Sequence, residues 1–415
     1  MDLRQIILDL ATRGVRVGDS TARITDIQLR EGAPPYVRVP AGYVIVDDIT
    51  VTREMLAQFF AWMHPSPRRG APDPGLAPAW QVALDADPRQ SIVRACTLES
   101  AIRLRATLFR HGEADADGQH ALAASIRVLP LAVPSMERLG LHSFLREWIR
   151  CSGLVLVTGA TGMGKSTTIA ALLNYVNTDP RFGSRNIITL EGPIEYRLSS
   201  QLSIMTQREV GEGSVRDFEA GIEAALRQRP DILMIGEILT RDAAAAALRA
   251  ALSGHTVVAT VHGDSAVGAL QSLLGLFPPD EVGTRAKELA RALVGVTYQR
   301  LAPSLDETRP VLAAEQLTNT EPSRRLIETL KFQELDNDMK ARSGKSMWTL
   351  EADLANLVKR RQVSAEWARA LANDPDHLER LLRAAHVPSS AGTAAGSPNR
   401  GVAPSGAGSD APHDT

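Results

Sequence analysis

Cysteine is scarce in this sequence, which contains only Cys96 and Cys151. The two have no CxxC spacing, so neither a zinc site of that type nor a disulfide framework is expected. We expect two buried, reduced thiols, which suits a cytoplasmic protein.

Long apolar runs are lacking as well. None approaches the roughly 18–20 residues that a membrane-spanning helix requires. The N-terminus carries charges at Asp2, Arg4 and Asp9 and has no apolar core of the signal-peptide type. We therefore expect a cytoplasmic chain whose association with a membrane is peripheral.

A strong net charge is also absent, because 46 Lys and Arg residues are balanced by 48 Asp and Glu residues and the formal net charge is −2. Such a chain offers no overall basic field for nucleic acid. Stretches in which aromatic and basic residues alternate, which single-strand-binding motors use, are missing too. A helicase-like reading is disfavoured, and no direct sequence-specific contact with nucleic acid is expected.

The first part of the chain, residues 1–130, predicts an α+β domain. The predicted strands are 24–29, 43–46, 101–109 and 125–129, and the predicted helix is 52–62. A stretch rich in Pro, Gly and Arg near 65–79 predicts a loop, and 112–119 predicts a polar turn.

A different pattern follows over residues 131–300, where continuous apolar runs alternate with helical stretches. The runs are 154–157, 187–190, 232–235 and 256–261. Apolar strands that alternate with helices predict an α/β fold with a parallel sheet covered on both faces.

The rest of the chain predicts a helical C-terminal region over 301–388 and a disordered tail over 389–415, where Ser, Gly, Ala and Pro dominate. The predicted helices are 284–300, 322–342, 350–361, 364–373 and 375–385.

A phosphate-binding motif lies where the first apolar run meets a helical stretch. Residues 159–166 match G-x-x-x-x-G-K-[ST], the signature of a P-loop. In such a loop, backbone N–H groups surround phosphate oxygens at a helix N-terminus. The alternative is an ordinary glycine-rich turn without a ligand. The strand pattern before the motif and the helix pattern after it disfavour this alternative. The expected nucleotide-contacting residues are Gly159, Ala160, Thr161, Gly162, Met163, Gly164, Lys165, Ser166 and Thr167.

Two of these residues have specific expected roles. Lys165 would reach the β- and γ-phosphates of ATP, and the Ser166 hydroxyl would ligate Mg²⁺. ATP and Mg²⁺ are therefore the expected ligands.

Polar residues follow the second, third and fourth apolar runs, at 187–190, 232–235 and 256–261. The carboxyl ends of parallel strands lie on one edge of a sheet, so these residues are expected near one another. Glu237 follows the third run and is the candidate for polarising the attacking water. Glu191 and Glu195 follow the second, with Glu191 a candidate Mg²⁺ ligand, and His262 follows the fourth as a candidate γ-phosphate sensor. Each alone could be a solvated surface residue; their joint occurrence after a P-loop favours a site.

The motifs, in this order, resemble those of the secretion ATPase superfamily of type II and type IV secretion and type IV pili. Its acidic box is similar to 191–195, its next segments to 225–237, and its histidine box to 253–262. The resemblance implies a PAS-like N-terminal domain, a RecA-like P-loop core and ATP hydrolysis. It further implies a homo-hexamer at the cytoplasmic face of the inner membrane, where it acts on platform proteins of a secretion or pilus machine.

The family also uses arginines from its N-terminal domain to contact nucleotide at a domain or subunit junction. By resemblance, Arg103, Arg105 and Arg127 occupy those segments. The period of two along a strand independently places Arg103 and Arg105 on one face. The alternative is ordinary surface charge on a strand.

Within the superfamily, the chain resembles the retraction branch and its relatives in conjugation and type IVB secretion. The retraction motif survives only in part, at Arg325, Leu326 and Ile327, which favours plasmid transfer or type IVB secretion over pilus retraction. Two other departures from the family pattern are Gly192 in place of an Asp, and Leu239-Thr240 in place of an Arg-Asp pair. They predict slow turnover, or, alternatively, a nucleotide-binding regulatory subunit that hardly hydrolyses ATP.

Overall fold

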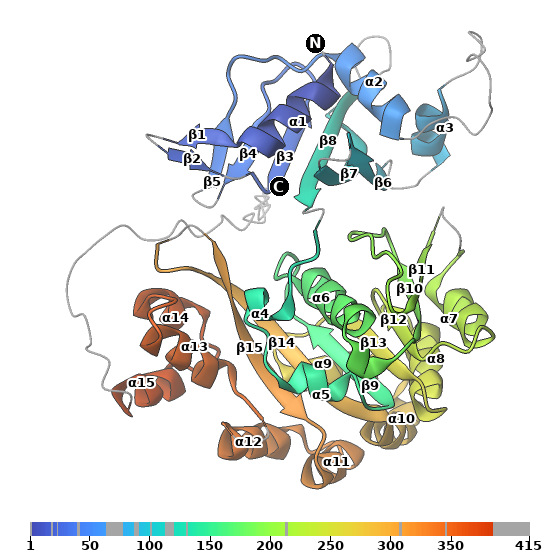
Figure 1. Ribbon diagram of the computed structural model, residues 1–415, viewed down its shortest axis with the longest axis vertical. Helices are drawn as coiled ribbons and strands as arrows, with labels where there is room; N and C mark the ends of the chain where they lie inside the picture. The colour runs from blue at the N-terminus through green and yellow to red at the C-terminus, as the bar shows by residue number, and fades with distance from the viewer. Residues whose placement is uncertain are drawn as a thin grey trace, which may run out of the picture.

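The computed structural model describes residues 2–384, except 18–19, 23, 40–41, 64–77, 87–90, 100–101, 113–119, 130–131, 212–214, 307–308 and 345–346. The predicted disordered tail lies outside these residues, as do most of the predicted loop near 65–79 and most of the predicted turn at 112–119. The described elements form two large sheets, one above the other in Figure 1.

The N-terminal sheet has six strands in the order β5-β4-β3-β8-β7-β6, and every neighbouring pair is antiparallel. Its strands are β3 (Asp26–Arg30), β4 (Tyr36–Val39), β5 (Gly42–Ile45), β6 (Ser91–Leu98), β7 (Ile102–His111) and β8 (Ala121–Leu129). The other elements are α1 (Leu3–Arg13), the ribbon β1 (Val15–Val17) and β2 (Ser20–Ala22), α2 (Arg53–Met63) and α3 (Ala79–Ala86).

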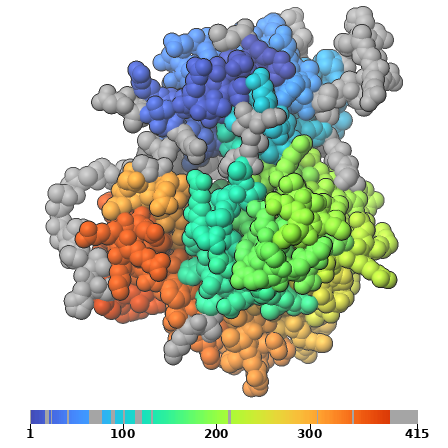
Figure 2. Space-filling view, viewed as in Figure 1, coloured from blue at the N-terminus to red at the C-terminus, as the bar shows by residue number. Residues whose placement is uncertain are grey.

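Helix α2 packs on this sheet through one apolar face. Leu56, Phe59 and Phe60 are buried along it, at helical spacing, and share a core with Leu104 and Leu108 of β7. The predicted α+β character of this part is confirmed, and Figure 2 shows it stacked on the rest of the molecule.

The second sheet has seven strands in the order β11-β10-β12-β13-β9-β14-β15. All neighbours are parallel except β14 and β15. The strands are β9 (Gly153–Thr158), β10 (Asn186–Glu191), β11 (Ile204–Glu209), β12 (Ile232–Ile235), β13 (Thr256–Val261), β14 (Leu293–Pro303) and β15 (Pro310–Thr318). The predicted RecA-like α/β core is thus confirmed.

Helices cover both faces of this sheet. Along β9, Leu154 and Leu156 enter one core, whereas Val155 and Val157 enter another on the opposite face. Burial on both faces explains why this strand is apolar throughout. The helices are α4 (Met136–Leu139), α5 (Phe144–Trp148), α6 (Lys165–Thr178), η1 (Pro180–Phe182), α7 (Phe218–Leu226), α8 (Arg241–Leu252), α9 (Ala266–Leu274) and α10 (Pro279–Ala292).

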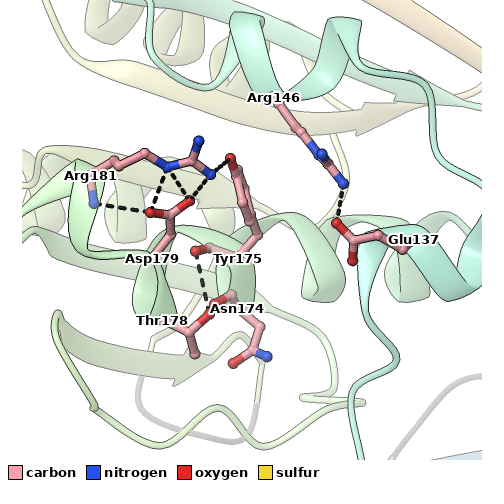
Figure 3. Close-up of polar contacts among 7 residues, drawn as sticks. All are labelled: Glu137, Arg146, Asn174, Tyr175, Thr178, Asp179 and Arg181. Atoms are coloured by element: carbon pink, nitrogen blue, oxygen red, sulfur yellow. Dashed lines mark hydrogen bonds and ion pairs between the residues drawn. The ribbon is translucent and has the colours of Figure 1, made fainter.

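Helix α6, which carries the P-loop residues at its start, is secured at its far end. Asp179 caps the following 3-10 turn and pairs with Arg181, which also donates to Tyr175 Oη at 3.2 Å (Figure 3). Hydrogen bonds from Arg181 hold the pKa of Asp179 below its ordinary value. Arg146 of α5 lies over the Tyr175 ring and pairs with Glu137 of α4. These contacts tie α6 to the helices that precede the core.

The C-terminal helices join the same core. They are α11 (Glu321–Glu328), α12 (Phe332–Arg342), α13 (Leu350–Lys359), α14 (Ala365–Leu371) and α15 (Pro375–Ala384). Leu354 and Leu378 are fully buried in the cluster that also contains Leu156 of β9. The predicted helices 350–361, 364–373 and 375–385 are therefore confirmed, with small differences at their ends. The predicted helix 322–342 is wrong as one element, because α11 ends at Glu328, Leu330 has φ 59°, and α12 begins at Phe332.

Three further features differ from the sequence-based expectations. The predicted helix 284–300 ends at Ala292, and β14 begins at the next residue. β15 extends the sheet beyond residue 300, into the region predicted to be helical, and the polar edge strand β11 was not predicted. β14 and β15 are apolar over most of their length because they are largely buried, and such runs resemble buried helices in sequence.

The two thiols also differ from expectation. Both cysteines are free, but Cys151 is exposed and only Cys96 is partly buried. Burial raises the pKa of Cys96 to about 11. Among the described residues, no helix is both long enough and apolar enough to cross a membrane.

A pair of glycines tests the packing of the core. A Cβ on Gly295 of β14 would lie 2.5 Å from the Trp148 ring, whereas a Cβ on Gly283 of α10 would meet nothing within 4 Å. Gly295→Ala should lower the free energy of unfolding by about 1–3 kcal/mol through overpacking. Gly283→Ala should raise it by up to about 1 kcal/mol through helix propensity. Urea titrations of both variants check this. Equal changes in the free energy of unfolding would contradict the close contact between Gly295 and Trp148.

Candidate nucleotide-binding site

The candidate site lies along the carboxyl edge of the parallel strands. Strand register brings the strand ends side by side: Val261 of β13 is opposite Thr158 of β9, and Ile235 of β12 is opposite Ala259 of β13. The residues that follow these strands, Gly159, Glu237 and His262, therefore share one edge. The predicted arrangement of the P-loop and the polar strand ends is observed.

The loop from Gly159 to Gly164 connects β9 to α6. Gly159 has φ 146° and Gly164, the N-cap of α6, has φ 79°, values that favour glycine. A Cβ on Gly159 would also lie 2.5 Å from the carbonyl oxygen of Gln299. These two positions of the motif are thus glycine for conformational and steric reasons, and the loop ends at a helix N-terminus, where anions bind favourably.

The amine of Lys165 folds back over this loop. Its Nζ donates to Gly159 O at 2.7 Å and to Ala160 O at 3.2 Å. Burial lowers the pKa of Lys165, and the carboxylates of Glu237 and Glu195 oppose that shift. The amine is therefore bonded to the loop and interacts electrostatically with two carboxylates that follow β12 and β10.

Glu237 and His262 form a pair. His262 Nε2 lies 2.5 Å from Glu237 Oε1, and their side chains are 56% and 34% exposed. Thr260 donates its hydroxyl to Gly236 O, and Ile238 N donates to Thr260 O at 3.0 Å, which ties the β12 end to β13. The pair is partly exposed, and the hydrogen bonds between β13 and the residues after β12 restrain its position.

Glu191, the predicted Mg²⁺ ligand, is engaged within the protein. Its Oε1 accepts hydrogen bonds from Thr189 Oγ1 at 2.6 Å and Gln207 Nε2 at 2.9 Å. Burial raises the pKa of Glu191, against the effect of these two bonds. A direct bond to metal would require these partners to share the carboxylate, so water-mediated contact suits it better.

The acidic box contacts both the P-loop helix and the N-terminal sheet. Tyr196 Oη lies 2.9 Å from Thr167 Oγ1 in the first turn of α6. Glu195 pairs with Arg105 of β7 at 2.7 Å. Arg103, on the same face of β7, donates through Nε to Ile194 O at 3.2 Å.

The three candidate arginines thus differ in placement. Arg103 is only 4% exposed, so simple surface charge is wrong for it, and burial together with the nearby Arg197 lowers its pKa. Arg105 reaches the acidic box. Arg127, opposite Arg105 in the sheet, instead pairs with Asp26 of β3 at 3.2 Å. The structure brings two of the three to the candidate site.

Sequence reasoning missed several contacting residues, chiefly Gln299, Gln207 and Tyr196. Gln299 of β14 donates to Met163 O in the loop at 2.6 Å and accepts from Thr168 Oγ1 at 3.0 Å. Its signal was a neutral polar residue inside an apolar run. Gln207 lies in the unpredicted strand β11 and offered no comparable signal.

The structure shows the surroundings of the two departures from the family pattern. A Cβ on Gly192 would make only ordinary contacts with Val210, so space does not require glycine there. Thr240 is the N-cap of α8, where its hydroxyl accepts from Ala243 N at 3.3 Å. Leu239 is exposed. The helix start after Glu237 is therefore intact.

The residues present are suited to a nucleotide with Mg²⁺. Within the described residues, no group of three or more His, Cys, Asp or Glu side chains can hold a metal ion. A Mg²⁺ ion here would therefore take phosphate and water oxygens, with Ser166 at the start of α6 supplying a hydroxyl. A glycine-rich loop, a lysine and this hydroxyl are the donor set of a P-loop.

Fold and site together define a P-loop protein with a RecA-like core. A family model described as "Type II/IV secretion system protein" matches residues 122–378. The chain belongs to this family of secretion and pilus ATPases.

Individual relatives agree with this assignment. The chain is 37% identical over 253 residues to the uncharacterized protein YggR of Escherichia coli K12, covering 61% of this chain and 76% of that one. It is 35% identical over 256 residues to the type IV pilus retraction ATPase PilT of Pseudomonas aeruginosa, covering 61% and 73%. The crystal structure of the pilus retraction motor PilT with bound ADP superposes with a TM-score of 0.73 at 31% identity, covering 92% and 99%.

Glu315 of β15 is a buried carboxyl beside the start of α9. It accepts a hydrogen bond from Ala266 N, at the start of the helix that follows the His262 loop, at 2.6 Å. Burial raises the pKa of Glu315 from 4.5 to about 7, with Glu351 and Asp336 adding to the shift.

Between pH 4.5 and about 7 this carboxyl binds more protons in the folded state than in the unfolded state. The free energy of unfolding should therefore fall as the pH rises through this range. Glu315→Gln keeps an acceptor for Ala266 but removes the titration. Its stability relative to the unaltered chain should rise by about 3 kcal/mol between pH 4.5 and 7. Urea titrations across this range check it, with the exposed Glu366→Gln as control; parallel profiles for Glu315→Gln and the unaltered chain would contradict it.

Proposed function

We propose that this chain is an ATPase and a motor subunit, assembled as a homo-hexamer, of a type IV pilus or type IV/IVB secretion machine, conjugative plasmid transfer included. One observation carries the proposal: Lys165 lies on the carbonyl groups of its own glycine loop and interacts electrostatically with Glu237, which pairs with His262 on the same sheet edge.

The chemistry follows from these placements. Backbone N–H groups of the loop and the Lys165 amine would bind the β- and γ-phosphates. Glu237, at the end of β12, is suited to orient and polarise a water molecule, and His262 would hold the carboxylate and respond to the γ-phosphate. Bound Mg²⁺ would neutralise charge on the phosphate oxygens.

Contacts between the two sheets support coupling of the site to motion. Arg103 and Arg105 of the N-terminal sheet hold Ile194 and Glu195 of the acidic box. Glu195 in turn interacts electrostatically with Lys165. Opening and closing of this junction with the nucleotide state would transmit force to an inner-membrane platform from the cytoplasmic face. Arg127 joins this role only if its pairing with Asp26 is exchanged.

The choice of machine rests on the relatives. The partial retraction motif favours conjugation or type IVB secretion, whereas the 35% identity to a pilus retraction ATPase supports the pilus alternative. The pilus retraction role is therefore the first to test genetically, by deleting the gene and scoring twitching beside plasmid transfer.

A regulatory subunit that binds ATP without turnover is the second candidate. Gly192 and exposed Leu239, which replace charged residues of the family pattern, favour it. A phosphate-release assay on the unaltered protein separates this candidate from a motor.

Lys165→Ala tests the nucleotide site directly. Loss of the amine removes a charge-assisted phosphate contact, so kcat/KM for ATP should fall at least about a hundredfold. Lys287→Ala, on the exposed side of α10, is the matched control and should hydrolyse ATP normally. Normal turnover by the Lys165 variant would overturn the proposed function.

Glu237→Gln separates binding from chemistry. The amide cannot accept a proton, so kcat should fall at least about a hundredfold while the affinity for a fluorescent ATP analogue changes little. Glu223→Gln, on an exposed position of α7, is the control. If the unaltered chain binds ATP but releases no phosphate, the regulatory candidate replaces the motor.

A further inference from the structure

Gln299 of β14 contacts the P-loop from beneath. Its side chain is 1% exposed and bridges two points: Nε2 donates to Met163 O at 2.6 Å, and Oε1 accepts from Thr168 Oγ1 at 3.0 Å. Met163 belongs to the loop and Thr168 to the first turn of α6. One buried amide thus joins the loop to the helix that it precedes.

The bond to Met163 also fixes the orientation of a peptide unit. In a trans peptide, the C=O of one residue and the N–H of the next point to opposite sides. Because the Met163 carbonyl is directed to Gln299, the N–H of Gly164 is directed away from it. That N–H is one of the donors at the start of α6 that have no partner within the helix. A phosphate oxygen can accept a hydrogen bond from it.

The main chain of β14 adds two further contacts to the same loop. The carbonyl oxygen of Gln299 lies where a Cβ of Gly159 would be, 2.5 Å away. Leu301 N lies 3.4 Å from Met163 Sδ. The register of β14 with β9, with Tyr298 opposite Thr158, places Gln299 beside Gly159. Both ends of the loop therefore rest on one strand.

The strand is held from its other side as well. Arg300 donates to the carbonyl oxygen of Leu371 and, at 2.8 Å, to Asn373 Oδ1 in the segment after α14. Asn373 Nδ2 donates to Asp264 O, just after His262, at 3.2 Å. A group can position another only if it is itself immobile, and these contacts restrain β14.

We propose that Gln299 is a positioning residue for the nucleotide phosphates: its amide holds the loop in the conformation that directs Gly164 N–H to the phosphate. This role rests on the proposed nucleotide site and adds to it a residue outside the P-loop motif. It acts on binding of the phosphates and not on the attacking water.

Gln299→Leu removes both bonds at similar volume. Unpairing a buried carbonyl and hydroxyl and releasing the loop should raise the Kd for a fluorescent ADP about tenfold. Since ground state and transition state would lose the same contact, KM for ATP should rise about tenfold and kcat should change less than about threefold. A general loss of structure would instead lower kcat and the melting temperature together.

Gln299→Glu gives a second, reversible test. The carboxylate can still accept from Thr168 but cannot donate to Met163 O, whereas the protonated acid can do both. The Kd of this variant for fluorescent ADP, divided by that of the unaltered chain at the same pH, should therefore fall from pH 8 to pH 5.5. A ratio independent of pH would contradict the role assigned to the donated bond.

Gln316→Leu is the matched control. Gln316 is equally buried, on β15 of the same antiparallel pair, and its Oε1 lacks a hydrogen-bond partner among the described residues. This variant should bind ADP like the unaltered chain. Unchanged affinity in Gln299→Leu would overturn only the role of Gln299. Failure of the unaltered chain to bind ADP would overturn the proposed function and this inference with it.

Discussion

The parallel pairing of β9 with β13 is the interaction on which the candidate site depends. Its main-chain register sets Val261 opposite Thr158, so that the loop after β9 and His262 after β13 emerge together. A slip of one residue would turn every side chain of one strand to the opposite face. Both strands are buried on two faces, so such a slip would disrupt the close packing of two cores.

Much of this site could be predicted from the sequence because its signals are local. The P-loop motif, an apolar strand before it and a helix after it are all read within one short segment. Glu237 and His262 were predictable because each lies within two residues of the end of a buried strand, and parallel strands end on one edge. The period of two along a strand placed Arg103 and Arg105 on one face of β7.

The rest depended on contacts between distant segments. β14 and β15 were not separated from helices, because a strand buried on both faces has no alternation to report its period. Arg103 donates to Ile194 O in the segment after β10 of the other sheet, and the pairing of β14 with β9 brings Gln299 to Met163. Contacts between segments that are far apart in the chain cannot be predicted from the spacing within one segment. Arg127, which the family resemblance grouped with Arg103 and Arg105, pairs with Asp26 instead.

The position of Glu195 has a consequence for the whole molecule. This one carboxylate is bonded to Arg105 of the N-terminal sheet and also acts on the charge of Lys165. An anion at Lys165 and the contact with Arg105 would therefore act on the same carboxylate. By reciprocity, any free energy that an anion at Lys165 adds to the Arg105 contact is returned as affinity for that anion. Through this shared acid, nucleotide binding and the contact between the two sheets would each influence the other.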